Sequence, residues 1–269
     1  MIFADLDLAR RLEGVEAWCG AEFARARMQT RPEADTAAVS VAGGYAFFFG
    51  AGSPLTEAKG MGMSGPVAAE ELDQMEHVFS VRGVPAKVMV CPLADPSLLD
   101  GLTRRGYQPT GFEDVLYRAL DRFETFPPPG EIAVAWAGPE QTELYGQTLA
   151  RGFVAPEEPG PEILEITAMA TCVEGMKGLL ARVDGKPAGA ASLLIRNGLA
   201  LLAGASTLPP YRNRGIQTSL AYIRLDYAAA AGCELATMGA APGSTSHRNA
   251  ERLGFRVAYS KLVLVRDFS

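Results

Sequence analysis

The sequence predicts an α/β protein of two similar domains, each a mixed, mostly antiparallel sheet flanked by helices. Three observations support this fold class: a strand and helix unit that occurs twice, a proline-rich segment between the two copies, and short apolar runs joined by tight-turn dipeptides. The chain has 269 residues, of which 48% are hydrophobic. That is enough apolar material for two moderate cores, so we expect two domains.

The segment DRFETFPPPGE, residues 121–131, has the composition of a linker. It places three consecutive prolines and a glycine after the apolar, strand-like run FEDVLYRAL. Prolines in a row stiffen a chain and cannot continue a helix or a central strand, so they are typical of connections between ordered parts. We therefore predict one domain at residues 1–127 and a second at residues 128–269, with the boundary near Pro128.

The two predicted domains contain the same supersecondary unit. In the second half a helix ends at Gly232, a short strand follows, and another helix closes at Gly254 before an aromatic residue. Gly83 and Gly106 have the same roles in the first half, and the two spacings are 22 and 23 residues. Each unit is followed by an alternating strand, SKLVLVRDF or FEDVLYRAL. Such internal similarity indicates a repeated architecture.

The second half can be divided into elements from its periodicity and turns. Expected strands are EIAVAWA, GLLARVD, PAGAASLLIR and LALLAGAST, and expected helices lie around 140–149 and 163–173. The dipeptides Asp184-Gly185 and Asn197-Gly198 favour tight hairpin turns, so three antiparallel strands follow one another. Apolar residues then recur from Ile216 to Tyr227 at spacings of four, three and four, which is one face of an amphipathic helix that starts near Gly215.

The stretch LPPYRNRGIQTSL, residues 208–220, combines an open backbone, two cations and a helix start. The first turn of a helix has unpaired N–H groups and the positive end of the helix dipole, so it binds anions where side chains leave access. Gly215 provides that access, Arg212 and Arg214 supply charge, and the Thr218 hydroxyl lies one turn in. A phosphate or pyrophosphate suits this pattern. The alternative is a capped helix with two solvated arginines.

This pattern in its context resembles the GNAT superfamily of acyl-CoA-dependent N-acyltransferases. Antiparallel strands, then Pro-x-Tyr-Arg-x-Arg-Gly-Ile opening a helix, then a strand, then a helix closing in Arg-Leu-Gly-Phe follow the family's order over about residues 130–269. The family's phosphate signature, Gln/Arg-x-x-Gly-x-Gly/Ala, matches at Arg212 and Gly215. It departs at Gln217, where the family has glycine or alanine, and this side chain either crowds the pyrophosphate or hydrogen-bonds to it.

The resemblance implies where acyl-CoA lies. In the family it occupies a splay between the fourth and fifth strands, which correspond to LALLAGAST and CELATMG, and backbone groups pair with the pantetheine arm. The expected cofactor-binding residues are Thr207, Leu208, Arg212, Asn213, Arg214, Gly215, Ile216, Gln217, Thr218 and Asn249. Ser244 and Ser246 are expected to cap the last helix.

The catalytic groups are less evident from the sequence. Many relatives have a tyrosine as general acid four residues before the glycine of Gly-Phe, and this position is Ala250. Either the thiolate leaves with the help of water, or Tyr211 or Tyr259 donates the proton, or the domain is not a catalyst. Our candidate acid is Tyr259.

A base is also needed, because only a neutral amine attacks a thioester. Glu162 and Glu165 lie beside the proline-rich loop APEEPGPE, where the family binds acceptors, and Glu165 is our candidate. The alternative is that both carboxylates are solvated surface groups. His247 is expected to be an exposed residue at a helix start.

The first half lacks the phosphate motif. Aligning the repeats places KGMGMSGPVAAEEL, residues 59–72, over the motif, with Gly65 opposite Gly215. Pro66 follows without an N–H, and Glu70 and Glu71 in the next turn repel phosphate. We interpret this half as a degenerate domain, and we expect one CoA per chain.

Charge and composition exclude several function classes. A net charge of −6 and a pI near 5.1 give no general attraction to nucleic acid or to anionic membranes. Four scattered cysteines and two histidines form no metal-ligand spacing, so no metal is expected. No segment has the features of a signal peptide or a membrane span, and we expect a cytoplasmic protein with free thiols.

The leading hypothesis is an N-acyltransferase that moves an acetyl or other short acyl group from CoA to a primary amine of a small molecule. The attack is expected to be direct, in a ternary complex, because no cysteine is placed for a covalent acyl-enzyme. One alternative is a CoA-binding sensor or scaffold without turnover, and another is a transferase acting on a protein amine. A monomer and a homodimer are both compatible with the sequence.

Overall fold

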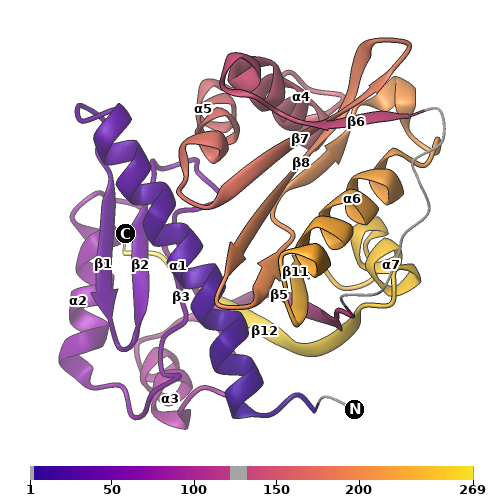
Figure 1. Cartoon of the computed structure of the whole chain (residues 1–269). Coiled ribbons are helices and arrows are strands. Elements are labelled where there is room, and N and C mark those ends of the chain that lie inside the picture. The colour runs from indigo at the N-terminus through magenta and orange to yellow at the C-terminus, as the bar shows by residue number, and fades with distance from the viewer. Residues whose placement is uncertain (1–2, 122–131, 269) are drawn as a thin grey trace. The chain divides into compact units, whose positions relative to one another are not determined.

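The computed structural model describes residues 3–121 and 132–268, which fall into two compact units (Figure 1). The first unit comprises Met1–Leu116, Gly239–Ala250 and Arg256–Ser269, and the second comprises Tyr117–Met238 and Glu251–Phe255. The last strand of the chain thus belongs to the first unit. Most of the predicted linker lies outside the described residues, so the boundary near Pro128 stays a prediction. No helix in the described ranges is long and apolar enough to cross a membrane.

The first unit is one sheet with helices on both faces. Its elements are α1 (Leu6–Thr30), β1 (Ala37–Val41), β2 (Gly44–Phe48), β3 (Ala58–Lys59), α2 (Ala69–Ser80), β4 (Ala86–Val90), α3 (Pro96–Arg104), most of β5 (Gln108–Ala119), most of α7 (Thr245–Arg252) and β12 (Arg256–Arg266). The strand order is β1-β2-β3-β4-β12-β5. The β3–β4 pair is parallel, and the β1–β2, β2–β3 and β4–β12 pairs are antiparallel.

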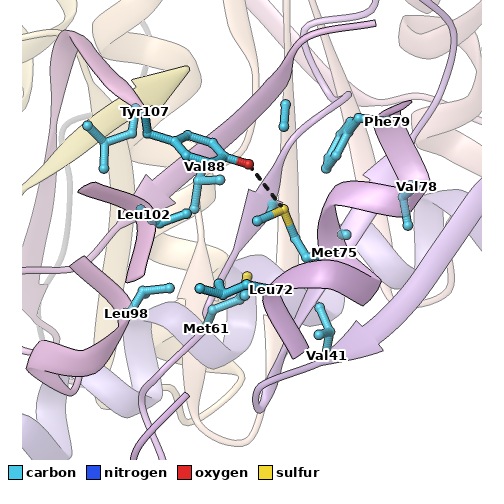
Figure 2. Close-up of a cluster of buried hydrophobic side chains, with 14 of the residues drawn as sticks. Val41, Met61, Leu72, Met75, Val78, Phe79, Val88, Leu98, Leu102 and Tyr107 are labelled. Carbon is cyan, nitrogen blue, oxygen red and sulfur yellow. Dashed lines mark hydrogen bonds between the residues drawn. The ribbon is translucent and has the colours of Figure 1, made fainter. Parts of the chain in front are cut away.

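Alternation along β2 assigns its side chains to two cores. Phe47 packs in a cluster with Phe49 and with Ala24 of α1. Phe48 faces the other way, into a larger cluster from α2, α3 and five strands, which Figure 2 shows around Met75. Successive side chains of a strand point to opposite faces, so one short aromatic run, GYAFF, serves both layers of this unit.

A buried charged cluster joins α1 to β12, the first helix to the last strand. Lys261 is 1% exposed, and its Nζ lies 3.1 Å from Glu13 Oε1 and 2.6 Å from Glu16 Oε2. The Tyr259 hydroxyl donates to the same Glu13 oxygen at 2.8 Å. Burial raises the pKa of the Glu13 carboxyl, and the attraction of Lys261 opposes this only in part. Replacing one partner of such a pair leaves an uncompensated buried charge.

The second unit is also a mixed sheet. Its elements are β6 (Ala133–Trp136), η1 (Pro139–Gln141), α4 (Thr142–Val154), α5 (Pro161–Met169), η2 (Ala170–Cys172), β7 (Met176–Val183), β8 (Lys186–Arg196), β9 (Leu199–Leu201), β10 (Ala205–Thr207), η3 (Pro209–Tyr211), α6 (Ile216–Ala230) and most of β11 (Leu235–Ala240). The strand order is β11-β9-β8-β7-β6, with β10 also paired to β8. Only the β9–β11 pair is parallel among those that involve β6 to β10.

The α/β fold class and the turns predicted from the sequence are confirmed. Both residues of Asp184-Gly185 and of Asn197-Gly198 have positive φ, as a type I′ hairpin turn requires. The strand between them, β8, is antiparallel to β7 and to β9. The mostly antiparallel character of this sheet follows from these two short turns.

The repeated helix–strand–helix–strand unit is also present as predicted. Gly83 and Gly106 follow α2 and α3, and Gly232 and Gly254 follow α6 and α7. All four have φ between 62° and 82°, the left-handed region that ends helices and favours glycine.

A second buried ion pair in the first unit leads to a prediction about acid stability. Glu57 Oε1 lies 2.5 Å from Lys59 Nζ, and Glu57 Oε2 lies 2.8 Å from Lys87 Nζ. Burial alone would raise the pKa of Glu57, but the two ammonium groups outweigh it and lower the pKa to about 2. A lowered folded-state pKa stabilises the protein above the ordinary value of 4.5 and loses that effect as the pH falls toward about 2.

We therefore expect Glu57→Gln to lower the free energy of unfolding at neutral pH by about 3 kcal/mol. The difference from the wild type should shrink as the pH falls from about 4.5 to about 2, in denaturant titrations over a pH series. Glu33→Gln is the matched control, because Glu33 is exposed and its ion pair with Arg31 is long, at 3.7 Å. If Glu57→Gln lowered the free energy of unfolding by the same amount at every pH, the lowered pKa of Glu57 would be contradicted.

Candidate functional site

The start of α6 in the second unit is an open helix N-terminus. Gly215 is the N-cap residue, and among the residues that the structure describes no side chain caps this end or places an acidic group in its first turn. Gly215 is exposed, and a Cβ atom on it would meet only Ile132 Cδ1, at 3.9 Å. The first N–H groups and the positive end of the helix dipole thus face accessible space. An anion is the natural ligand at such a position.

The loop before α6 is held in a specific backbone conformation. Asn213 has φ of 61° and Gly215 has φ of 82°, both left-handed. Asparagine and glycine are the residues that adopt this region most readily. The sequence RNRG therefore fits its turn, and the helix begins one residue after Gly215, as predicted.

The two arginines of the motif have different surroundings. Arg212 donates to the carbonyl oxygens of Thr207 and Gly152, both at 3.3 Å, and so links the loop to β10 and to the end of α4. The Arg214 guanidinium lies 5.9 Å from the centre of the Tyr211 ring. Both arginines are exposed. Arg212 therefore has a structural role in addition to its charge, whereas Arg214 presents its charge at the surface.

Gln217, the departure from the family pattern, is engaged with β10. Its Nε2 donates to the Thr207 hydroxyl at 3.0 Å, and Thr207 is buried. The Leu208 N–H donates to the Ala188 carbonyl at 2.9 Å, which extends the pairing of β10 with β8. Thr207, Leu208 and the residues from Arg212 to Thr218 are thus brought together at one end of the second unit.

The strand predicted from LALLAGAST is two strands separated by a bulge, so the prediction of one continuous strand was wrong. Leu194 pairs with Leu201, whereas Ala191, three residues earlier on β8, pairs with Ala205, four residues later. One extra residue is therefore accommodated between β9 and β10. The three small or apolar residues from Leu202 to Gly204 form this bulge.

The bulge marks the point where β10 leaves β11. The parallel pairing of β9 with β11 runs from Leu199 to Leu201 and ends with a hydrogen bond of 2.9 Å from the Leu202 N–H to the Thr237 carbonyl. Beyond it, β10 pairs with β8. The two strands that lie on either side of the expected cofactor thus diverge after Leu202, as the resemblance implies.

The end of α4 lies against the bulge and β10. The Ser206 hydroxyl donates to the Leu149 carbonyl at 2.8 Å, and Gly152 packs so closely on Ser206 that a Cβ atom would clash. The Phe153 side chain is 51% exposed, and its ring lies 3.4 Å from where a Cβ atom of Gly204 would stand. The exposed ring of Phe153 therefore lies beside the bulge.

The candidate catalytic residues fall in different units. Glu165 is half-buried on α5 of the second unit. Tyr259 is on β12 of the first unit, where it is 7% exposed and donates to Glu13. Burial, together with the Glu13 charge, raises the pKa of the Tyr259 hydroxyl. Its role as the general acid stays a prediction, and this contact does not favour it, because the hydroxyl proton is directed to Glu13.

The candidate residues of α7 lie in the first unit. Asn249 is half-buried, and Ala250 is 1% exposed. Ser244 accepts from the His247 N–H at 3.1 Å, which confirms its predicted capping role. His247 itself is half-buried, not exposed as predicted, because its Nδ1 lies 3.1 Å from Asp114 Oδ2. Nothing in the sequence indicated this contact between distant residues.

The equivalent helix start in the first unit is closed to anions. The Ala68 N–H donates to Glu71 Oε2 at 2.9 Å, so the helix's own carboxylate occupies the first turn of α2. The Gly62 carbonyl accepts from the Asp95 N–H at 2.8 Å, which joins the chain after β3 to the start of α3. The N-cap is Ala68, so the alignment of Gly65 with Gly215 was wrong by three residues.

Comparison with known proteins agrees with this arrangement. Residues 144–255 match the model of the acetyltransferase (GNAT) family. No curated protein matches the sequence. The fold is similar to that of a GCN5-related N-acetyltransferase from Kribbella flavida, with a TM-score of 0.60 and 19% identity, covering 93% of this chain and 96% of that one.

Two further structures share the fold. One is a GCN5-related N-acetyltransferase from Sphaerobacter thermophilus, with a TM-score of 0.56, 18% identity, and coverage of 74% of this chain and 64% of that one. The other is a tandem GNAT protein from the clavulanic acid biosynthesis pathway, with a TM-score of 0.54, 15% identity, and coverage of 73% and 67%. At these identities the likeness concerns the fold.

The conformation of Gly215 leads to a prediction. Alanine is the better helix former, but at φ of 82° an L-residue is strained, so Gly215→Ala should destabilise the protein by about 1 kcal/mol. Gly160→Ala is the matched control, because Gly160 is the N-cap of α5 with φ of −64° and open space around its Cβ position. Thermal unfolding of both variants should show a loss for Gly215→Ala alone. Equal stability of the two variants would contradict the backbone argument.

Proposed function

The chain carries a domain of the acetyltransferase (GNAT) family, and we propose that this domain is an N-acyltransferase that moves an acetyl, or another short acyl, group from CoA to a primary amine of a small molecule. The observation that carries the proposal is the uncapped start of α6, with Arg212 and Arg214 beside it. This arrangement suits the pyrophosphate of CoA because backbone N–H groups, the helix dipole and two guanidinium groups all favour negative charge.

The residues between the strands suit the rest of an acyl-CoA. The divergence of β10 from β11 after Leu202 leaves backbone groups for the pantetheine amides. The exposed ring of Phe153 provides an apolar contact beside the bulge. Bound acyl-CoA supplies an activated carbonyl and a thiolate leaving group. The protein has to hold that carbonyl and accept the proton of the amine.

The proposed reaction is a direct attack. The amine nitrogen loses a proton to Glu165 and forms a bond to the acyl carbon, and the carbon–sulfur bond breaks to release CoA thiolate. The thiolate takes its proton from water. Ala250 stands where relatives have a tyrosine, and the Tyr259 hydroxyl donates its hydrogen bond to Glu13. Glu165→Gln should therefore lower kcat and leave the KM for acetyl-CoA nearly unchanged.

A CoA-binding sensor without turnover is the second candidate, and Ala250 is the observation that favours it. The two functions are separated by measuring thiol release from acetyl-CoA with a panel of small primary amines. Release with at least one amine, above the rate of hydrolysis, supports the transferase. CoA binding without release for any amine supports the sensor. If thiol is released only with a protein amine as the acceptor, the third hypothesis, a protein acetyltransferase, is supported.

One prediction of the proposed function concerns the contact of Arg214 with the phosphates of CoA. Arg214→Gln should weaken CoA binding by about 1–2 kcal/mol, because one charge-assisted contact is lost, while the affinity for a pantetheine fragment without phosphates should stay unchanged. Lys186→Gln, at the exposed β7–β8 hairpin of the same unit, is the charge-matched control. Calorimetric titrations of both ligands measure the difference. An equal loss for CoA and pantetheine would mean that Arg214 acts through the fold.

The second prediction is a stoichiometry of one CoA per chain. The start of α6 is open, whereas Glu71 closes the start of α2 with its own carboxylate. Titration calorimetry of the full chain should give one site, and Glu71→Gln should not create another, because the Gly62–Asp95 hydrogen bond also closes that region. Two equivalent sites per chain would refute the interpretation of the first unit as degenerate.

A further inference from the structure

Arg224 is a buried cation that has no carboxylate partner in the described part of the chain. It lies on α6, is 4% exposed, and makes its hydrogen bonds with main-chain oxygens. Its Nε donates to the Leu220 carbonyl at 3.0 Å, and its Nη1 donates to the carbonyls of Ser192 and Ala203, both at 3.1 Å. Within the described ranges no carboxylate forms an ion pair with it. Burial lowers the pKa of this guanidinium to about 10.

Packing alone does not account for an arginine at this position. A buried charge compensated only by neutral dipoles is costly, and an apolar residue of similar volume usually packs as well or better. The neighbouring residues Leu220 and Leu225 are fully buried and apolar. The contacts of Arg224 therefore have to explain its presence.

Those contacts are with the bulge. In a regular antiparallel ladder the Ser192 carbonyl would accept from the opposite strand, but it accepts from Arg224 instead. The Ala203 carbonyl is in the bulge itself, and the same nitrogen of Arg224 binds it. One guanidinium nitrogen thus bridges the two strands where the extra residue interrupts their pairing. The Ser192 N–H donates to the Gly204 carbonyl at 2.9 Å and completes the local geometry.

The bridge fixes the direction of the next N–H group. The Ala203 carbonyl and the Gly204 N–H belong to one peptide unit, and in a trans peptide they point in opposite directions. Because the carbonyl points to Arg224, the Gly204 N–H points away from it. Gly204 is exposed, and in the described part of the chain no backbone carbonyl accepts from this N–H.

We propose that Arg224 is a positioning residue, which holds the Ala203–Gly204 peptide so that the Gly204 N–H faces the carbonyl of the bound thioester. The inference rests on the proposed acyltransferase function and deepens it. Arg224 touches neither substrate. It acts through the bulge, and a fixed donor is worth more to a developing negative charge than a mobile one.

The test compares three variants of the full chain. Arg224→Met removes the bridge and keeps most of the volume, Arg224→Lys keeps a donor and a charge, and Leu225→Ala perturbs the same helix at a buried residue that has no hydrogen bond to the bulge. For Arg224→Met we expect kcat to fall on the order of 100-fold, as for loss of one oxyanion donor, with the KM for acetyl-CoA within about threefold. Leu225→Ala should lose stability and retain its kcat.

The lysine variant provides a readout that a purely structural role would not move. A buried lysine without a carboxylate has a lowered pKa. The titratable group that faces this position is Tyr145 of α4, and burial raises its pKa to about 12, so it stays neutral over the range of the test. Arg224→Lys should therefore recover activity at low pH, relative to the wild type, and lose it as the pH rises through that pKa. A pH profile parallel to that of the wild type, or Arg224→Met with kcat within threefold of the wild type, would overturn the proposal.

A second measurement does not depend on turnover. In Arg224→Met the Ser192 N–H should lose protection from amide hydrogen exchange, because the bulge relaxes. In Leu225→Ala its protection should fall no more than the global stability of the protein does. Unchanged protection in Arg224→Met would overturn the inference. If the wild type acetylates no amine, the proposed function fails, and the exchange experiment still decides whether Arg224 fixes the bulge.

Discussion

The one-residue bulge between β9 and β10 is the constraint on which the second unit depends. Without the extra residue, the run from Leu199 to Thr207 would continue along β11 as one parallel strand. With it, β10 separates from β11 and stays on β8, so the chain enters the loop before α6 away from β11. The divergence of the strands and the placement of the α6 N-terminus both follow from this single local irregularity. Bulges are common beside active sites for this reason.

The two halves of the sequence show how the same order of elements serves different ends. Each half has a helix, a left-handed glycine, a strand, a helix and a second left-handed glycine. At the start of α2 the Glu71 carboxylate accepts from the Ala68 N–H, whereas the start of α6 carries no acidic residue in its first turn. The difference lies in few side chains, and these decide whether an anion site exists. A shared fold thus says little about shared ligand binding.

The sequence was sufficient for features that depend on neighbours along the chain. The two hairpin turns, the helix start at Gly215 and the repeated unit follow from dipeptides, glycines and periodicity, and the structure contains all of them. The bulge was missed because Leu202, Ala203 and Gly204 continue an apolar run without a turn signal. Arg224 did leave a signal. It follows Leu220 by four residues, which places a charge on the apolar face of the helix.

Contacts between distant segments were beyond sequence reasoning. Glu13 and Tyr259 are 246 residues apart, and nothing in either neighbourhood announces their hydrogen bond. The sequence made Tyr259 a candidate acid because tyrosine has suitable chemistry. In the structure its proton is directed to the Glu13 carboxylate, beside Lys261. Chemistry can be assigned to a residue type from sequence, but the availability of its proton depends on packing partners that only the tertiary structure supplies.

Two of the buried cations, Lys261 and Arg224, illustrate two ways of compensating charge. Two carboxylates neutralise Lys261, so the charged cluster of the first unit has no net positive charge around that residue. Carbonyl dipoles surround Arg224 and leave its unit charge in place. The interior beneath the bulge therefore keeps a positive potential. Because interactions are weakly screened in a buried environment, this potential adds to that of the α6 N-terminus. In the proposed acyl transfer, it would favour the negative charge that develops on the thioester oxygen.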